Sequence, residues 1–444
     1  MTQKKWIVGI LLSVLVFGTG IIGCSESDSA VESLFPLPIP QPIKPVSSPV
    51  PPPFDWEDPE LPSRLQKALD LWSEDYGING AAARVTSWGW FDWAGSSGKA
   101  NVEEDIPYER HTKGRIASAS KTFTAAIILQ LIDEGLLDLD DRMSEFFPDY
   151  PRGEEITIDH LLRHRSGIPD IVLMDLLFIL EAFFNNDHWY TVEEILNWTK
   201  PSWIPIISIR HEMAAIPRDL MNEPGEKFHY SQPGYNTLGA IIEKKTGKPL
   251  ADVYHERIAV PLGLTNTYLP CKDDPPEPLG YTNLFGLLTL MEPILDPFDL
   301  QPDKVPTSNF FGENANALVS AGWAAGGIVS TGGELVTFLS AMLQGLLFSE
   351  EALALATDWI EIEPGDVVSA GEYGMGLMRI ENDDNVFIGH DGALPGGGSV
   401  MKYIPNLDVY VGAVINTDRD WGSEAPDLVE RVVSALLDED SVTD

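Results

Sequence analysis

The chain has 444 residues, a formal net charge of -39 and a hydrophobic fraction of 44%, with 12 Trp and 18 Phe. This length permits two domains, or one large domain with an insertion, and the apolar content suffices for a sizeable core. The acidic surface repels phosphate backbones and anionic lipid headgroups, which excludes nucleic acid as a partner.

Residues 1–23, MTQKKWIVGILLSVLVFGTGIIG, place two lysines before an apolar run that ends in small residues. This order is typical of an export signal peptide. The next residue, Cys24, completes a sequence that resembles a bacterial lipobox. We therefore predict a lipidated Cys24 and an exported protein, anchored to the bacterial cell envelope on its periplasmic or outer face. An uncleaved membrane anchor is the alternative, although the apolar run is short for a spanning helix.

Residues 24–62 contain the proline-dense stretch FPLPIPQPIKPVSSPVPPPF. Such spacing of prolines predicts an extended, polyproline-like tether between the membrane and the folded part. A proline-rich recognition motif is the alternative. The second cysteine of the chain, Cys271, has no nearby CxxC partner and is predicted to be structural.

The folded domain is predicted over 63–440. Residues 64–77, RLQKALDLWSEDYG, have apolar residues at helical spacing and end at a glycine. Residues 80–100, GAAARVTSWGWFDWAGSSGKA, predict two strands around a Trp-Gly turn.

Ser118 stands three residues before Lys121, at the start of a long apolar run that predicts a buried helix. Side chains at i and i+3 share one face of a helix, so the lysine can reach the serine oxygen. Burial near a helix N-terminus disfavours the charged lysine, and a lysine that loses its proton readily can accept one from a serine hydroxyl. The alternative is that Ser118 is an ordinary helix N-cap.

Residues 136–319 have helix-forming and loop-forming sequence and predict an inserted all-helical region. Their most apolar run is IVLMDLLFILEAFF, residues 171–184. This run is too short to span a bilayer and predicts a core helix, with a lid over an acyl-binding site as the alternative.

Tyr230 and Gln232 stand just before another apolar helix, in FHYSQPGYNTLGAIIEKKTG. A buried tyrosine is ordinarily a core residue with a satisfied hydroxyl group. A tyrosine that faces a lysine is different, because the positive charge favours phenolate and makes the tyrosine a candidate general base.

His390, Asp391 and Gly392 lie in a strand-like segment, GHDGALPGGG, whose glycines let a substrate backbone approach closely. A backbone N–H in this segment can form an oxyanion hole with the N–H of Ser118. Taken alone, the segment is equally compatible with any tight turn.

The last part of the chain predicts further strands and then an amphipathic helix, APDLVERVVSALLDE. Strands from about 63–135 and 320–440 must meet in one antiparallel sheet. The predicted fold is therefore α+β, with an antiparallel sheet flanked by helices.

Together these stretches resemble the serine β-lactamase and penicillin-binding-protein superfamily, in its branch of class C β-lactamases, DD-peptidases and family VIII esterases. That group carries S-x-x-K, Y-x-N and K-T-G or H-x-G in this order. The matching segments are Ser118-Ala119-Ser120-Lys121, Tyr230-Ser231-Gln232 and His390-Asp391-Gly392. Similar stretches also occur at 156–170 (ITIDHLLRHRSGIPD), 324–335 (AAGGIVSTGGEL) and 373–378 (YGMGLM), and the resemblance covers about residues 65–437.

The resemblance implies that Ser118 attacks a carbonyl and forms an acyl-enzyme, while Lys121 and Tyr230 shuttle the proton. It implies an oxyanion hole made by the backbone N–H groups of Ser118 and Ala393. It places His390 near Tyr230 and the substrate carboxylate. It implies no metal and no organic cofactor, and its substrates are peptides ending in D-Ala-D-Ala, β-lactams or small esters.

Two features depart from the pattern of the efficient β-lactamases. Gln232 replaces an asparagine and His390 replaces a lysine. Gln232, Asp391 and Gly392 are predicted to contact substrate, and the charge of Asp391 favours uncharged esters over a substrate with a carboxylate.

Three rival interpretations remain. His160 and His164 are four residues apart, but no glutamate follows the first histidine as in H-E-x-x-H, so we predict structural roles rather than a metal site. No serine occupies a G-x-S-x-G elbow. The sequence thus predicts a serine hydrolase of the β-lactamase or D-alanyl-D-alanine carboxypeptidase type, with a carboxylesterase or a non-catalytic envelope-binding protein as alternatives.

Overall fold

The computed structural model describes residues 48, 50–174, 178, 181–182, 185, 188–200, 202–207, 215–272, 281–282, 316–362, 371–382, 384–394, 396–418 and 424–438. They all belong to one unit, Leu37–Asp444. The predicted signal peptide, Cys24 and the tether up to residue 47 lie outside the described residues, as does most of the run from 175 to 184. No helix in the described part of the chain has the length and apolar character needed to cross a bilayer.

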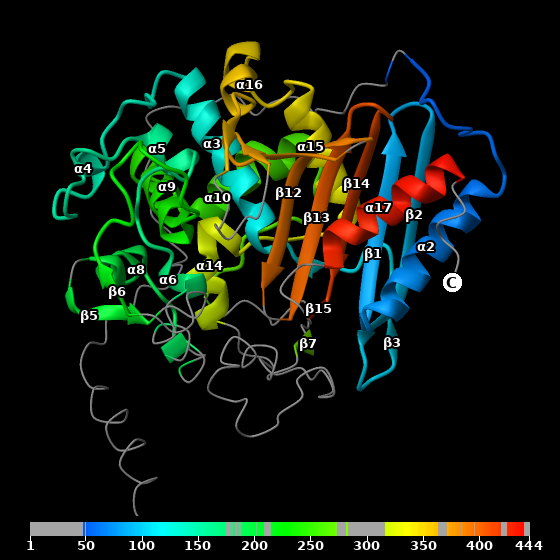
Figure 1. Ribbon diagram of the computed structural model, residues 1–444, viewed down its shortest axis with the longest axis horizontal. Coiled ribbons are helices and arrows are strands. Elements are labelled where there is room, and N and C mark those ends of the chain that lie inside the picture. The colour runs from blue at the N-terminus through cyan, green and yellow to red at the C-terminus, as the bar shows by residue number, and fades with distance from the viewer. Residues whose placement is uncertain are drawn as a thin grey trace, which may run out of the picture. The chain divides into compact units, whose positions relative to one another are not determined.

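A nine-stranded antiparallel sheet runs in the order β3-β2-β1-β14-β13-β12-β11-β10-β9 (Figure 1). Its strands are β1 (Gly80–Ser87), β2 (Phe91–Asn101), β3 (Ile106–Pro107), β9 (Ile360–Glu361), β10 (Glu372–Tyr373), β11 (Met378–Glu381), β12 (Val386–Leu394), β13 (Gly397–Ile404) and β14 (Val409–Ile415). Strand β1 pairs with both β2 and β14, and Ala81 lies opposite Ile415. The predicted meeting of strands from both ends of the chain is confirmed.

The two faces of the sheet belong to two hydrophobic cores, because successive strand residues point to opposite sides. Ala81 and Ala83 of β1 pack in the core that includes residues of α2 (Leu61–Asp75) and α17 (Glu424–Leu437). Ala82 packs in the core that includes residues of α3 (Ser120–Asp133) and α15 (Gly332–Leu343). Figure 1 shows α2 and α17 side by side across one face of the strands.

The region from 136 to 319 combines helices with turns and loops where it is described. Its helices are α4 (Met143–Phe146), α5 (Ile158–Leu162), α6 (Ile171–Met174), α8 (Val192–Thr199), α9 (Gln232–Thr246), α10 (Leu250–Tyr254), α11 (Val260–Leu262) and the start of α14 (Asn316–Gly326). However, β5 (Ser202–Ile207) and β6 (Ala215–Arg218) pair as a separate antiparallel hairpin. The prediction of an all-helical insertion is therefore wrong at this point, where isoleucines favour extended backbone.

The packed part of the chain begins before the predicted boundary at residue 63. Phe54 is buried in the same core as α2, and the backbone N–H of Ser48 donates to Trp88 O at 2.9 Å. The indole Nε1 of Trp90 donates in turn to Ser48 O at 3.1 Å. The end of the proline-rich stretch is thus held against the turn between β1 and β2.

Candidate active site

Ser118 lies in a one-turn 3₁₀ helix that leads directly into α3. The preceding residue, Ala117, has a φ of 48°, which is unfavourable for a residue with a Cβ atom and is often found at functional sites. Ser118 is partly exposed, whereas both of its neighbours are buried. Neither this turn nor α3 has a side-chain cap hydrogen bond, so the alternative of an ordinary N-cap is wrong.

The backbone before Ser118 is held from two sides. The N–H of Ile116 donates to Ile328 O at 3.0 Å, and the hydroxyl of Ser399 on β13 donates to Ile116 O at 2.7 Å. The following helix, α3, is buried on nearly all sides, and the hydroxyl of Thr122 donates to Gly376 O at 2.6 Å. Ser118 therefore sits on backbone that is held by packed strands and helices.

Lys121 is completely buried, and its ammonium nitrogen donates three hydrogen bonds. Its Nζ donates to Ser118 Oγ at 3.1 Å, to Gln232 Oε1 at 3.1 Å and to Ala325 O at 2.8 Å. Burial lowers the pKa of Lys121 to about 7, and the charge of Asp170 opposes this shift. Lys121 can therefore exchange a proton with Ser118 near neutral pH.

The start of α9 brings Tyr230 and Gln232 to this lysine. The side chain of Ser231 is the N-cap of α9, and it accepts a hydrogen bond from the N–H of Gly234 at 3.1 Å. Lys121 Nζ lies 4.7 Å from the centroid of the Tyr230 ring, which is 3% exposed. The structure thus places the three predicted residues Lys121, Tyr230 and Gln232 together.

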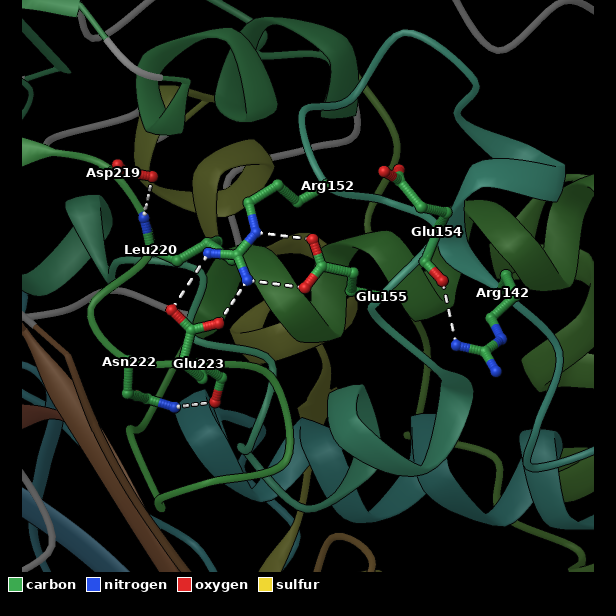
Figure 2. A network of polar contacts seen from close by, with 8 residues as sticks. All are labelled: Arg142, Arg152, Glu154, Glu155, Asp219, Leu220, Asn222 and Glu223. Carbon is green, nitrogen blue, oxygen red and sulfur yellow. Dashed lines mark hydrogen bonds and ion pairs between the residues drawn. The ribbon is translucent and has the colours of Figure 1, made fainter.

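The loop of residues 219–229, which precedes Tyr230, is tied to residues 152–155 by a charged network (Figure 2). Arg152 contacts two carboxylates, with Nη2 at 2.7 Å from Glu155 and at 2.5 Å from Glu223. The same loop carries a hydrogen bond from Asn222 Nδ2 to Glu223 O at 2.9 Å. These contacts lie at the surface, where ion pairs contribute little stability but can restrict a loop.

His390 on β12 is also fully buried. Its Nε2 lies 3.3 Å from Tyr373 Oη, and its Nδ1 lies 2.6 Å from its neighbour's carbonyl, Asp391 O. Burial, reinforced by the positive charge of Lys121, holds the pKa of His390 well below its usual value. The imidazole is therefore neutral at neutral pH and acts as a hydrogen-bonding group rather than as a cation.

Asp391 does not reach the site, contrary to the prediction that it contacts substrate. It lies opposite Val400, which packs in the core with α2 and α17, while His390 lies opposite Met401 in the other core. Its carboxylate instead pairs with Lys402 at 2.8 Å. The physical reason is strand alternation, which sends adjacent side chains to opposite faces.

Gly392 permits the close approach of β12 to the turn that carries Ser118. A Cβ atom at this position would lie 2.0 Å from Ile116 O, so no larger residue fits without a shift of backbone. The last pairing of β12 with β11 joins Gly389 to Met378. In the described part of the sheet, β12 therefore continues past the end of β11, and Ala393 lies in this continuation. A backbone N–H that serves as an oxyanion donor requires such a position, without a neighbouring strand on that side.

Sequence reasoning missed two aromatic groups of the site. Tyr373 contacts His390, and the imidazole of His164 stacks on the Tyr230 ring at a centroid distance of 4.2 Å. Both lie in stretches that carry the family resemblance, which is the signal that could have found them. The ring of His160 accepts a hydrogen bond from Thr157 N at 3.3 Å, and the described residues contain no cluster of His, Cys, Asp and Glu suited to a metal ion.

A nine-stranded sheet, with a partly exposed serine in contact with a buried lysine, fits a serine hydrolase that works through an acyl-enzyme. The chain belongs to the Beta-lactamase family, which it matches over residues 65–433. The predicted fold and enzyme class are confirmed, against the alternative of a non-catalytic binding protein.

Three similar proteins illustrate this membership. Penicillin-binding protein 4* of Bacillus subtilis is 25% identical over 349 residues, which span 77% of this chain and 68% of that protein. Esterase EstB of Burkholderia gladioli is 29% identical over 248 residues, which span 51% of this chain and 58% of the esterase. The structure of D-amino acid amidase from Ochrobactrum anthropi SV3 is 25% identical, with a TM-score of 0.68 over 85% of this chain and 99% of the amidase.

Proposed function

We propose that the protein hydrolyses small esters or amides that carry no carboxylate beside the scissile bond, through an acyl-enzyme on Ser118. The observation that carries the proposal is the 3.1 Å contact between Ser118 Oγ and the fully buried Nζ of Lys121. With a pKa lowered to about 7, this amine can accept the serine proton at neutral pH.

In the acylation step, Ser118 Oγ forms a bond to the carbonyl carbon while its proton passes to Lys121 Nζ. The electron pair of the carbonyl moves to its oxygen, which accepts hydrogen bonds from the N–H groups of Ser118 and Ala393. Tyr230, beside Lys121, passes the proton on to the leaving group as the carbon–heteroatom bond breaks. Water then attacks the ester, its proton follows the reverse path, and the Ser118 hydroxyl is restored.

The proposed preference for uncharged substrates rests on β12. This strand contributes a neutral His390 to the site, and its ion pair between Asp391 and Lys402 lies on the other face. A substrate carboxylate would therefore meet a hydrogen-bonding group at this strand rather than a fixed positive charge. The names of two similar proteins, an esterase and a D-amino acid amidase, support the same substrate class.

One experiment separates the candidate substrates. The wild-type protein and the Ser118→Ala variant are incubated with p-nitrophenyl butyrate, D-phenylalanine amide and a fluorescent penicillin, and turnover and covalent labelling are measured. We expect ester or amide turnover that Ser118→Ala abolishes. A stable penicillin label without such turnover would instead favour an enzyme of the penicillin-binding type, as the name of the Bacillus subtilis relative suggests. Turnover that survives Ser118→Ala would contradict the nucleophile.

We further propose that the enzyme is a lipoprotein of the bacterial cell envelope. The support is the sequence alone: a signal-like segment over residues 1–23 followed by Cys24. The proline-rich stretch after it would hold the catalytic domain away from the membrane at about 3.1 Å per residue.

A further inference from the structure

The segment from 164 to 167 supports the loop that leads to Tyr230. Backbone N–H groups of the loop donate to backbone carbonyl groups of this segment at three positions: Met221 to Gly167 at 2.7 Å, Gly225 to Arg165 at 2.8 Å and His229 to His164 at 2.7 Å. The side chain of Arg165 also donates to Gly225 O. The two segments therefore run together up to Tyr230.

His164 holds Tyr230 from three directions. Its carbonyl oxygen accepts from the N–H of His229, just before the tyrosine, at 2.7 Å. Its Nδ1 accepts from the N–H of Ser231, just after the tyrosine, at 3.0 Å. Between these two bonds, its imidazole stacks on the Tyr230 ring at 4.2 Å with an interplanar angle of 29°. Both flanking peptide groups and the ring itself are thus fixed by one residue.

The conformation of His164 is costly for the fold. Its φ of 56° is unfavourable for a residue with a Cβ atom, and its buried Nε2 has no hydrogen-bond partner among the described residues. Each of these features lowers the stability of the folded state. Such costs persist where surrounding structure or function requires them.

The imidazole must be neutral to hold the tyrosine, since Nδ1 accepts a hydrogen bond and cannot carry a proton. Burial and the nearby positive charge of Lys121 keep the pKa of His164 well below its usual value. Two other histidines, His390 and His229, act in the same direction. The contact with Ser231 is therefore retained throughout the pH range in which Lys121 titrates.

We propose that His164 is the positioning residue of Tyr230, fixing the tyrosine ring and the start of α9 relative to Lys121. The inference rests on the proposed role of Tyr230 in proton transfer. His164 does not itself touch the reacting atoms, so its loss slows the proton-transfer step without removing a group that binds substrate. We therefore expect an effect on kcat rather than on KM.

Two substitutions suit a backbone with positive φ. Glycine adopts this conformation freely, and asparagine tolerates it better than most residues do. His164→Gly removes both the ring and the acceptor, whereas His164→Asn keeps a side-chain acceptor near the former Nδ1. The control is His160→Asn, because His160 lies one helical turn earlier and caps α5 without contacting Tyr230.

The test is a double-mutant cycle with Tyr230→Phe, measured with p-nitrophenyl butyrate. We expect His164→Gly to lower kcat about 100-fold, with KM nearly unchanged, partial rescue by His164→Asn and no such loss in His160→Asn. In the Tyr230→Phe background, His164→Gly should cause little further loss. Equal losses in both backgrounds would overturn the proposal, as would full activity of His164→Gly.

Two controls keep the cycle interpretable. Circular dichroism reports whether each variant is folded, and if His164→Gly is not, the cycle is run with His164→Asn, whose partial loss should vanish in the Tyr230→Phe background. Persistence of that loss would overturn the proposal. If Tyr230→Phe alone retains full kcat, the proposed role of Tyr230 fails, which is a different result from additive losses.

Discussion

The amide oxygen of Gln232 accepts a hydrogen bond from Lys121 Nζ at 3.1 Å, and both residues are buried. This contact sets the orientation of the amide group, since only its oxygen can accept from an ammonium group. Gln232 was expected to contact substrate. In the structure its oxygen is a neutral hydrogen-bond partner of Lys121, and the contact with substrate stays a prediction.

Replacement of this neutral partner by an anion should shift the pH dependence of activity. In Gln232→Glu, a carboxylate beside the ammonium group favours its charged form and raises the pKa of Lys121 above the wild-type value of about 7. The acid limb of kcat/KM against pH should move to higher pH by about 1 unit or more. Gln232→Asn is the neutral control and should leave the midpoint in place. An unchanged midpoint in Gln232→Glu would contradict Lys121 as the base.

The buried lysine should also make stability depend on pH. Its pKa is about 7 when folded, against an ordinary value of 10.5, so the unfolded chain binds the extra proton between these values. The penalty for burying Lys121 therefore grows as pH falls from about 10 to 7 and stays constant below 7. Lys121→Met should thus raise the free energy of unfolding more at pH 6 than at pH 10. Urea unfolding of both proteins at the two pH values measures this, and equal differences would refute the shifted pKa.

The ion pair between Asp391 and Lys402 should matter for stability rather than catalysis. Lys402 is 3% exposed, so Asp391→Asn leaves a buried cation without its anion and should cost about 3 kcal/mol. Because this pair faces away from His390, kcat/KM should change less than about two-fold. The double variant Asp391→Asn with Lys402→Met should recover most of the lost stability. A large loss of kcat/KM in folded Asp391→Asn would return Asp391 to the site.

The close contact between β12 and the turn that carries Ser118 should leave no room for a methyl group at Gly392. Gly392→Ala would bring a Cβ atom to 2.0 Å from Ile116 O and must displace one backbone from the other. We expect a loss of kcat of about 100-fold, because the oxyanion donors move relative to Ser118. The matched control is Gly333→Ala, where the nearest atom would lie 3.6 Å away. Normal kinetics of Gly392→Ala would show that this contact can relax freely.

The proposed lipid anchor at Cys24 predicts that one substitution changes where the protein is found in the cell. Cys24→Ser removes the only thiol at the end of the signal-like segment, so the variant cannot be lipidated there. After fractionation of bacteria that produce it, the Cys24→Ser variant should be absent from the membrane fraction. The wild-type protein and Cys271→Ser should remain in that fraction. Continued membrane association of Cys24→Ser would mean that another feature of the chain attaches it.

Two parts of the site could be predicted because their geometry is local. Ser118 and Lys121 are three residues apart on a turn that continues into a helix, which brings their side chains together whatever the rest of the chain does. The same local logic, applied to β12, would have separated Asp391 from His390. Adjacent residues of a strand face opposite ways, so one strand cannot direct both His390 and Asp391 into the same site.

The sequence by itself determined the α+β order of elements, the buried helix after Ser118 and the motifs that mark a serine hydrolase, because periodicity and spacing act between near neighbours. Only the tertiary structure decided the contact of Gln232 with Lys121, across 111 residues, and that of Ala325 with Lys121, across 204. It also decided the stacking of His164 on Tyr230. Such contacts depend on how distant segments pack in one core, which no local pattern specifies.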